Sequence, residues 1–264
     1  MELKRIDQLV DLPFILVSGQ ARSGTTILTR AMAAHRSVLS NGLESTWLRD
    51  LMQLLQENLE NESRMRQCLV GPEQFSAIFR KAAFQILFPH EIWPDQVPHA
   101  VSTFSSLKQD VFPRLRDLLP QVKLLNIVRN GIEVVSSRMR HRAIGQLPFE
   151  RHCRAWSRAV DVVQWAGDDP FFKLVRHEQL LTDELPKLFA EIQQWAGLTG
   201  SDDCYQYVQQ NVINTTSGSA GAADKPDVLM NRSERWRDWT GEQRALFQQI
   251  CGPSMAYFGY PIPW

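Results

Sequence analysis

Short apolar runs alternate along the chain with longer stretches in which apolar residues recur at helical spacing. The runs at residues 14–17, 99–104, 122–128 and 171–175 have the length of short buried strands. The clearest of them is "VKLLNIV" (122–128). Apolar strands that alternate with helices predict a parallel sheet that is covered on both faces.

Helical spacing covers most of the sequence between these runs. In residues 182–197, Thr182 or Asp183 can cap the N-terminus, and Gly197 ends the helix. Since no repeat and no linker divides the chain, we expect a single α/β domain over residues 1–264, with a central parallel sheet flanked by helices. Ligands of such sheets bind at the C-terminal ends of the strands. The other expected helices are residues 25–35, 43–59, 73–88, 131–142, 149–167 and 241–260.

Composition and charge narrow the class of protein. Lysine plus arginine equals aspartate plus glutamate, at 29 each, so no overall field attracts nucleic acid or an acidic membrane. The four cysteines are scattered without a C-x-x-C pair, which argues against a zinc or redox site and fits a reducing compartment. No run approaches the ~20 apolar residues of a membrane span, and no signal peptide is evident. We expect a cytoplasmic protein with no nucleic-acid or membrane partner.

The stretch "VSGQARSGTT" (17–26) follows the first predicted strand and has the glycine spacing of a phosphate-binding loop. Gly19 and Gly24 stand as in G-x-x-x-x-G-K-[ST], but Thr25 replaces the loop lysine, and the cation is Arg22. The backbone N–H groups and hydroxyls of this loop, with the following helix N-terminus, predict a concave anion site. The alternative is a simple glycine turn between a strand and a helix.

A second cation stands at the tip of the strand 122–128. A magnesium-dependent NTPase commonly has an aspartate there, whereas this strand ends in Arg129, and Ser137 follows on the next helix. A cation in this position predicts a second anion site and no metal. The alternative is an arginine paired with a surface carboxylate. The stretch after residue 175, which contains His177, indicates no function by itself.

Together these stretches resemble the sulfotransferases that use 3′-phosphoadenosine 5′-phosphosulfate (PAPS), most closely the branch that includes tyrosylprotein sulfotransferases. "GQARSGTTILTRAMAAH" is similar to that branch's 5′-phosphosulfate loop, G-x-P-R-S-G-T-T-L-x-R-A-M-x-x-H. "VRNGIEVVSS" is similar to its 3′-phosphate element, V-R-[DN]-x-x-x-x-x-x-S. "AWSRAVDVV" and "VRHEQLL" resemble its W-x-x-A-[IV] and R-Y-E-x-L signatures, and the terminal "FGYP" is also similar. The resemblance runs from about residue 14 to residue 260 and implies a P-loop-like sulfotransferase fold.

The resemblance implies a site for PAPS, with the 3′,5′-bisphosphate PAP as product and no metal. Arg22 would stabilise the charge of the leaving phosphate without magnesium. His177 replaces the branch's tyrosine, and an imidazole can still stack on the base. Lys225 resembles a late lysine near the nucleotide, and Ser217 and Ser219 precede it in a loop that could close over the donor. The implied nucleotide-binding residues are Arg22, Ser23, Gly24, Thr25, Thr26, Arg129, Ser137, His177 and Lys225.

The general base implied by the resemblance is Glu44. The branch carries a glutamate in a "GEE" stretch soon after its first helix, and "NGLES" occupies that region here. The alternative for Glu44 is a solvated glutamate in the first turn of a helix. His35 and His99 are the other candidates for the base, and His99 ranks below Glu44 because its local sequence fits no family motif.

The chain departs from the family at a lysine that helps the sulfate to leave. Many relatives carry it on the strand where this chain has Ser102 and Thr103. Lys108, one to two helical turns further on, could reach back, or Arg22 could suffice alone. The third possibility is a slow or inactive enzyme.

The leading hypothesis is a PAPS-dependent sulfotransferase that acts on a hydroxyl or amine of a small-molecule acceptor. A protein that binds PAP or PAPS without catalysis is the first alternative, because of the missing lysine. An ATP-dependent kinase is the second, and Thr25 and Arg129 argue against it. The identity of the acceptor and the oligomeric state are not readable from the sequence.

Overall fold

Parallel strands form the centre of the fold. The computed structural model describes residues 13–44, 47–68, 70–87, 99–105, 115–116, 119, 121–211 and 231–264. Within these residues a five-stranded sheet has the order β2-β3-β1-β4-β5, and each neighbouring pair is parallel. This confirms the predicted α/β class and central parallel sheet. The strands are β1 (Phe14–Gly19), β2 (Val38–Glu44), β3 (His99–Ser105), β4 (Val122–Val128) and β5 (Phe172–Arg176).

Among the described residues, helices lie in the connections from β1 to β2, from β2 to β3 and from β4 to β5, and in the chain after β5. None of the described helices is both long enough and apolar enough to cross a bilayer. The α-helices are α2 (Thr25–Ala33), α3 (Trp47–Leu59), α4 (Glu62–Met65), α5 (Pro72–Leu87), α7 (Gly131–Met139), α8 (Phe149–Ala166), α9 (Leu185–Ala196), α10 (Asp203–Gln210) and α12 (Gly241–Tyr257). Two 3₁₀ helices are η1 (His177–Leu181) and η2 (Asn231–Asp238).

The order of the strands reverses at β1. The chain builds β2 and β3 on one side of β1 and later adds β4 and β5 on the other. In open parallel sheets, ligands bind beyond the carboxyl ends of the strands at such a point. The register pairs Gly19, the last residue of β1, with Ile127 of β4. The loop after β1 and the tip of β4 therefore lie side by side.

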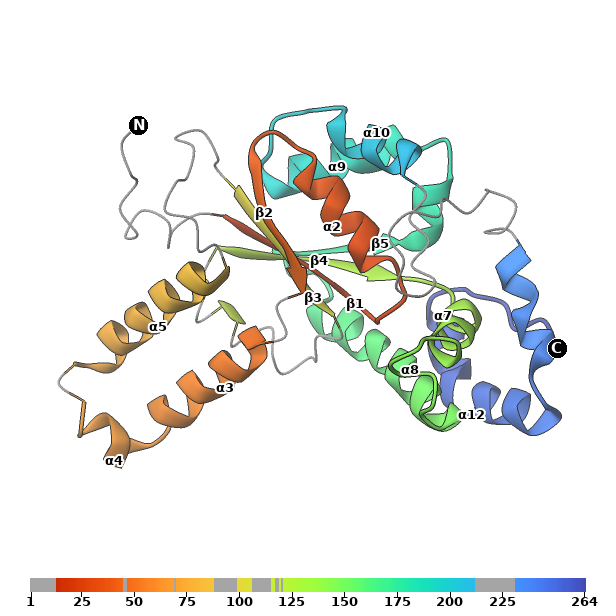
Figure 1. The fold of residues 1–264 in the computed structure, drawn as a ribbon, viewed down its shortest axis with the longest axis horizontal. Coiled ribbons are helices and arrows are strands. Elements are labelled where there is room, and N and C mark those ends of the chain that lie inside the picture. The colour runs from red at the N-terminus through yellow and green to blue at the C-terminus, as the bar shows by residue number, and fades with distance from the viewer. Residues whose placement is uncertain are drawn as a thin grey trace.

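Two hydrophobic cores cover the two faces of the sheet, because successive strand residues point to opposite sides. Phe14 and Leu16 pack with residues of α3, α5 and α8, whereas Ile15 and Val17 pack with residues of α2, α9 and α10. A third core joins Val128 to α7, α8 and α12. Figure 1 shows α2, α9 and α10 on one side of the sheet and α7, α8 and α12 on the other.

The edge strand β2 is the main departure from the sequence-based expectation. The pattern predicts a helix from residue 43, but residues up to Glu44 belong to β2, and α3 begins at Trp47. The sequence of β2, "VLSNGLE", has few residues that favour strands, and its register with β3 shifts between Ser40 and Glu44. The pattern also does not predict α10, which adds Cys204 and Val208 to a core.

Candidate functional site

The loop after β1 turns sharply and leads into α2. Ser23 donates its backbone N–H to the carbonyl oxygen of Gln20 at 2.9 Å, which closes the turn. Gly24 occupies the N-cap position of α2 with a φ of 105°, and no described side chain caps this helix. The first N–H groups of α2 are therefore available to an anion at the positive end of the helix dipole.

Close contacts explain both glycines of the loop. A Cβ at Gly19 would lie 2.3 Å from the carbonyl oxygen of Ile127, and a Cβ at Gly24 would lie 2.7 Å from Cδ2 of His177. The backbone thus approaches its neighbours more closely than any side chain would allow. The structure places His177, the first residue of η1, directly against the loop.

Arg22 bridges the loop and α7. Its φ of 83° lies in the left-handed region, which costs a non-glycine residue roughly 1–2 kcal/mol. Its Nε donates to Oγ of Ser137 at 3.1 Å, and Nη1 of Arg129 approaches its carbonyl oxygen at 3.5 Å. The two anion-binding elements predicted from the sequence therefore touch each other.

Arg129 lies buried at the tip of β4, where protein groups hold both its backbone and its side chain. Trp156 donates from Nε1 to the carbonyl oxygen of Arg129 at 3.0 Å. The guanidinium donates to Oε2 of Glu133 from Nε, at 2.8 Å, and from Nη2. The alternative that the sequence leaves open is an arginine paired with a surface carboxylate. Arg129 is paired with a carboxylate, but that of Glu133 is only 19% exposed. The carboxylate lies within the candidate site, one helical turn from Arg129.

Glu178, in η1 just after β5, connects the tip of β5 to the tip of β4. Glu178 accepts a hydrogen bond from the backbone N–H of Asn130 on Oε1 and another from the hydroxyl of Tyr260 on Oε2, both at 2.9 Å. Burial, and next the Glu178 carboxylate, raise the pKa of the Tyr260 phenol, so the phenol stays protonated and donates. Glu178 therefore fixes η1, which begins at His177, against the turn that carries Arg129.

Several cationic side chains lie near the loop. Burial, and next the charge of Arg129, lower the pKa of Arg22. Burial also lowers the pKa of Arg138, and burial together with the charges of Arg22 and Arg138 lowers the pKa of His141. The charge of Arg129 thus acts on Arg22, and the charges of Arg22 and Arg138 act on His141, in a chain whose formal net charge is zero. Such a concentration of positive charge attracts a multiply charged anion.

The buried hydroxyl of Ser23 indicates whether the loop fits an anionic group. Its side chain is only 1% exposed, and its Oγ has no hydrogen-bond partner among the described residues. A buried hydroxyl without a partner is unfavourable, and a phosphate or sulfate oxygen held in the loop would accept a hydrogen bond from it. Thr25 is also buried here, whereas Thr26 is exposed. The residues of the loop therefore fit the phosphosulfate end of PAPS.

Glu44, the predicted base, lies at the C-terminal ends of the strands, as the loop does. It is the last residue of β2, and its partner in register is Thr103 of β3. It therefore does not belong to the first turn of a helix. Thr103 is buried, and its Oγ1 lies 2.6 Å from Oγ1 of Thr29 in α2. On the strand where many relatives carry a lysine, this chain has Ser102 and Thr103. The hydroxyl of Thr103 is hydrogen-bonded to α2, and Lys108 lies outside the described residues.

His35 and His99, the other candidates for the base, lie near the N-terminal ends of the strands, opposite the loop. His99 is the first residue of β3, where the parallel strands begin. Its Nε2 lies 3.1 Å from the carbonyl oxygen of Ala196, and Nε2 of His35 lies 2.9 Å from that of Thr199. Both rings are thus engaged near the end of α9, away from the loop.

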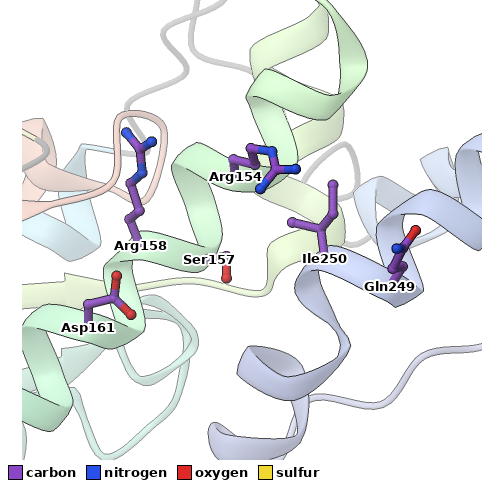
Figure 2. Close-up of a pocket in the computed structure, with 6 residues that line it drawn as sticks. All are labelled: Arg154, Ser157, Arg158, Asp161, Gln249 and Ile250. Atoms are coloured by element: carbon purple, nitrogen blue, oxygen red, sulfur yellow. The ribbon is translucent and has the colours of Figure 1, made fainter.

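A shallow groove between α8 and α12 is separate from these residues (Figure 2). Its arginine Arg154 is bonded to Glu150 on the same helix. None of the predicted site residues that the structure describes lines the groove. Of the remaining predictions, Lys225, Ser217 and Ser219 lie outside the described residues. The groove is lined by Arg154, Ser157, Arg158, Asp161, Gln249 and Ile250.

Comparison with known proteins identifies a family for most of the chain. A model of the sulfotransferase family matches residues 13–203, which include the loop, the Arg129–Ser137 element and η1. No curated protein sequence matches the chain.

Several solved structures have a similar fold. The sulfotransferase domain of the olefin synthase from Synechococcus PCC 7002 is 15% identical, with a TM-score of 0.56 over 95% of this chain and 96% of that chain. The sulfotransferase domain from the curacin biosynthetic pathway is 14% identical, with a TM-score of 0.55 over 94% and 98%. Mouse sulfotransferase SULT7A1, solved in complex with PAP, is 14% identical, with a TM-score of 0.50 over 95% and 87%.

Proposed function

Because the chain belongs to the sulfotransferase family, we propose that it transfers a sulfuryl group from PAPS to a hydroxyl or amine of a small-molecule acceptor. The observation that carries this proposal is the hydrogen bond between Arg22 and Ser137, which joins two separate anion-binding elements. A nucleotide with phosphates on both its 5′ and 3′ sides needs two such elements, whereas ATP needs only the first. Within the family, the sequences of both elements favour the tyrosylprotein sulfotransferase branch.

The proposed chemistry needs no metal from this chain. PAPS supplies a sulfuryl group that moves in line to the acceptor through a loose transition state. Arg22 stabilises the negative charge that develops on the leaving phosphate, and Glu44 takes the proton of the acceptor. Arg129 and Ser137 hold the 3′-phosphate, and His177 contacts the base. The proposed nucleotide-binding residues are Arg22, Ser23, Gly24, Thr25, Thr26, Arg129, Ser137, His177 and Lys225.

One observation favours a second function, the binding of PAP or PAPS without catalysis. Thr103 stands on the strand where relatives carry a lysine, and its hydroxyl is bonded to Thr29. A threonine supplies no positive charge to the departing sulfate. If Arg22 does not suffice, the protein binds the nucleotide and transfers nothing.

Calorimetric titration with PAP, in the absence of metal, tests the proposed site. We expect a Kd on the order of micromolar and, for Arg129→Ala, at least roughly tenfold weaker binding, because one charge-assisted contact is lost. Arg154→Ala is the matched control, since Arg154 is an exposed arginine that pairs with a carboxylate four residues away, as Arg129 does.

Two outcomes decide between the candidates. Equal or tighter binding of ATP with magnesium would contradict the sulfotransferase proposal. Tight PAP binding without any release of PAP from PAPS, across a panel of phenol, alcohol and amine probes, would favour the second function.

A further inference from the structure

Gln20, the first residue after β1, is buried between the loop, α7 and α8. Its side chain is 5% exposed. The orientation of the carboxamide is assigned from its neighbours: in the orientation that satisfies both its oxygen and its nitrogen, the oxygen accepts hydrogen bonds from Nη1 of Arg138 at 2.7 Å and from the backbone N–H of Ala21 at 3.2 Å. The carboxamide nitrogen donates to the carbonyl oxygen of Ala155. One side chain thus joins the loop backbone to both helices that lie beside it.

The neighbour of Gln20 explains why the loop needs this connection. Ala21 stands where the pattern G-x-P-R-S-G-T-T has a proline. A proline ring fixes φ near −65° and carries no N–H group, whereas alanine leaves φ free and adds a donor that needs an acceptor. The carboxamide oxygen of Gln20 is that acceptor. At residue 21, hydrogen bonds therefore restrain the backbone of this chain, whereas a proline ring restrains it in the family pattern.

The next residue makes this restraint more important. Arg22 has a positive φ of 83°, a strained conformation that persists only where the surrounding structure enforces it. Free rotation at Ala21 would let Arg22 relax and would carry its guanidinium away from Ser137. The backbone of Gln20 opposes this as well, because its carbonyl oxygen accepts the N–H of Ser23.

We propose that Gln20 is a positioning residue that, together with Arg138, holds the phosphate loop in its anion-binding conformation and takes the place of a proline at residue 21. The identity of the bound anion rests on the proposed function, whereas the restraint itself does not. A loop that is ordered beforehand loses less entropy on binding. Gln20 therefore raises the affinity for the nucleotide without touching it.

The test combines Gln20→Met, which keeps the length of the side chain and removes its hydrogen bonds, with the double variant Gln20→Met/Ala21→Pro. Hydrogen exchange of the amides of residues 22–26, measured without nucleotide, should quicken on the order of tenfold in Gln20→Met and slow again in the double variant. The affinity for PAP should fall on the order of tenfold with a less favourable binding entropy, and should recover with the proline. Gln53→Met, at an exposed position on α3, is the control.

Each outcome decides the inference. Unchanged loop exchange in Gln20→Met, or a lower melting temperature with unchanged exchange and PAP affinity, would overturn the positioning role. No recovery in the double variant would overturn the replacement of a proline. If the wild-type protein does not bind PAP, the proposed function fails, and the exchange measurement still decides the restraint. Should Gln20→Met not fold, Arg138→Met removes the other end of the contact and is measured in the same way.

Discussion

At the scale of single residues, Arg129 shows how a neighbour changes what a cation does. The sequence places an arginine at a strand tip, but it does not show that Glu133 accepts from two nitrogens of the guanidinium. Both side chains are largely buried, at 9% and 19% exposure. A carboxylate in this position stabilises the charge of the arginine and competes with any other anion for its donors. We therefore infer that Glu133 lowers the affinity for a 3′-phosphate while it stabilises the free protein.

Glu133→Gln should raise the affinity for PAP by roughly tenfold, which corresponds to the loss of about 1.4 kcal/mol of competition. The same change should lower the melting temperature of the free protein, because Arg129 loses its counter-charge. Calorimetric titration and thermal unfolding measure the two effects. Glu150→Gln is the matched control, since Glu150 pairs with Arg154 at the same spacing but in an exposed position, where such pairs contribute little. A fall in PAP affinity in Glu133→Gln would mean that Glu133 orients Arg129 instead of competing for it.

At the scale of elements, the strands that are buried on both faces could be predicted, and the edge strand could not. β1 and β4 are mostly apolar because helices cover both of their faces. β2 pairs only with β3 among the described strands, and it carries Ser40, Asn41 and Gly42 in its middle. Its sequence therefore does not read as a strand. For this reason the pattern places Glu44 near the start of a helix. In the structure Glu44 is the last residue of β2, at the C-terminal ends of the strands, where the loop also lies.

The position of Glu44 at the end of β2 leads to a prediction about catalysis. If Glu44 is the general base, Glu44→Gln should slow the release of PAP from PAPS by about 100-fold or more, measured with an aliphatic alcohol or an unsubstituted phenol as probe acceptor, whose hydroxyl keeps its proton near neutral pH. The affinity for PAP should not change, because the base acts on the acceptor. Glu57→Gln, at an exposed position on α3, is the control. Unchanged turnover would exclude Glu44 as the base, and weaker PAP binding would instead assign it to the nucleotide site.

At the scale of the whole molecule, the sequence identifies the parts of the site but not the contacts between them. The loop and the Arg129 element carry local patterns, and the reversal of strand order at β1 brings them together. The hydrogen bond from Arg22 to Ser137 spans 115 residues of sequence, and that from Asn130 to Glu178 spans 48. Contacts of this length leave no periodic signal. The length of the strands also separates the candidate site from a second group of titratable side chains, His35 and His99, near the N-terminal ends of the strands.

Buried histidines, among them His99 at the N-terminal ends of the strands, should make the stability of the protein depend on pH. Burial is the main cause that lowers the pKa of His99, although the carbonyl group of Ala196 raises it in part, and the charge of Lys123 lowers it further. His152 lies elsewhere, in α8 near Arg138, and burial and the charge of Arg138 lower its pKa as well. The pKa of each folded-state ring lies below the value of about 6.5 in the unfolded chain, so the unfolded state binds more protons as the pH falls. Their contribution to stability is therefore complete above about pH 6.5 and is lost as the pH falls through the folded-state pKa.

Thermal unfolding of the nucleotide-free protein should show a melting temperature that falls between about pH 7 and pH 5.5, a window that lies above the usual range of the carboxylates. His99→Gln should reduce this fall, because a glutamine can still donate to the carbonyl oxygen of Ala196 and does not titrate. His141→Gln is the comparison within the phosphate site, where burial and the charges of Arg22 and Arg138 lower the pKa of a partly exposed ring. If His99→Gln leaves the pH dependence as it is in the wild type, the buried ring at the end of α9 does not control the acid stability, and His152 becomes the next group to replace.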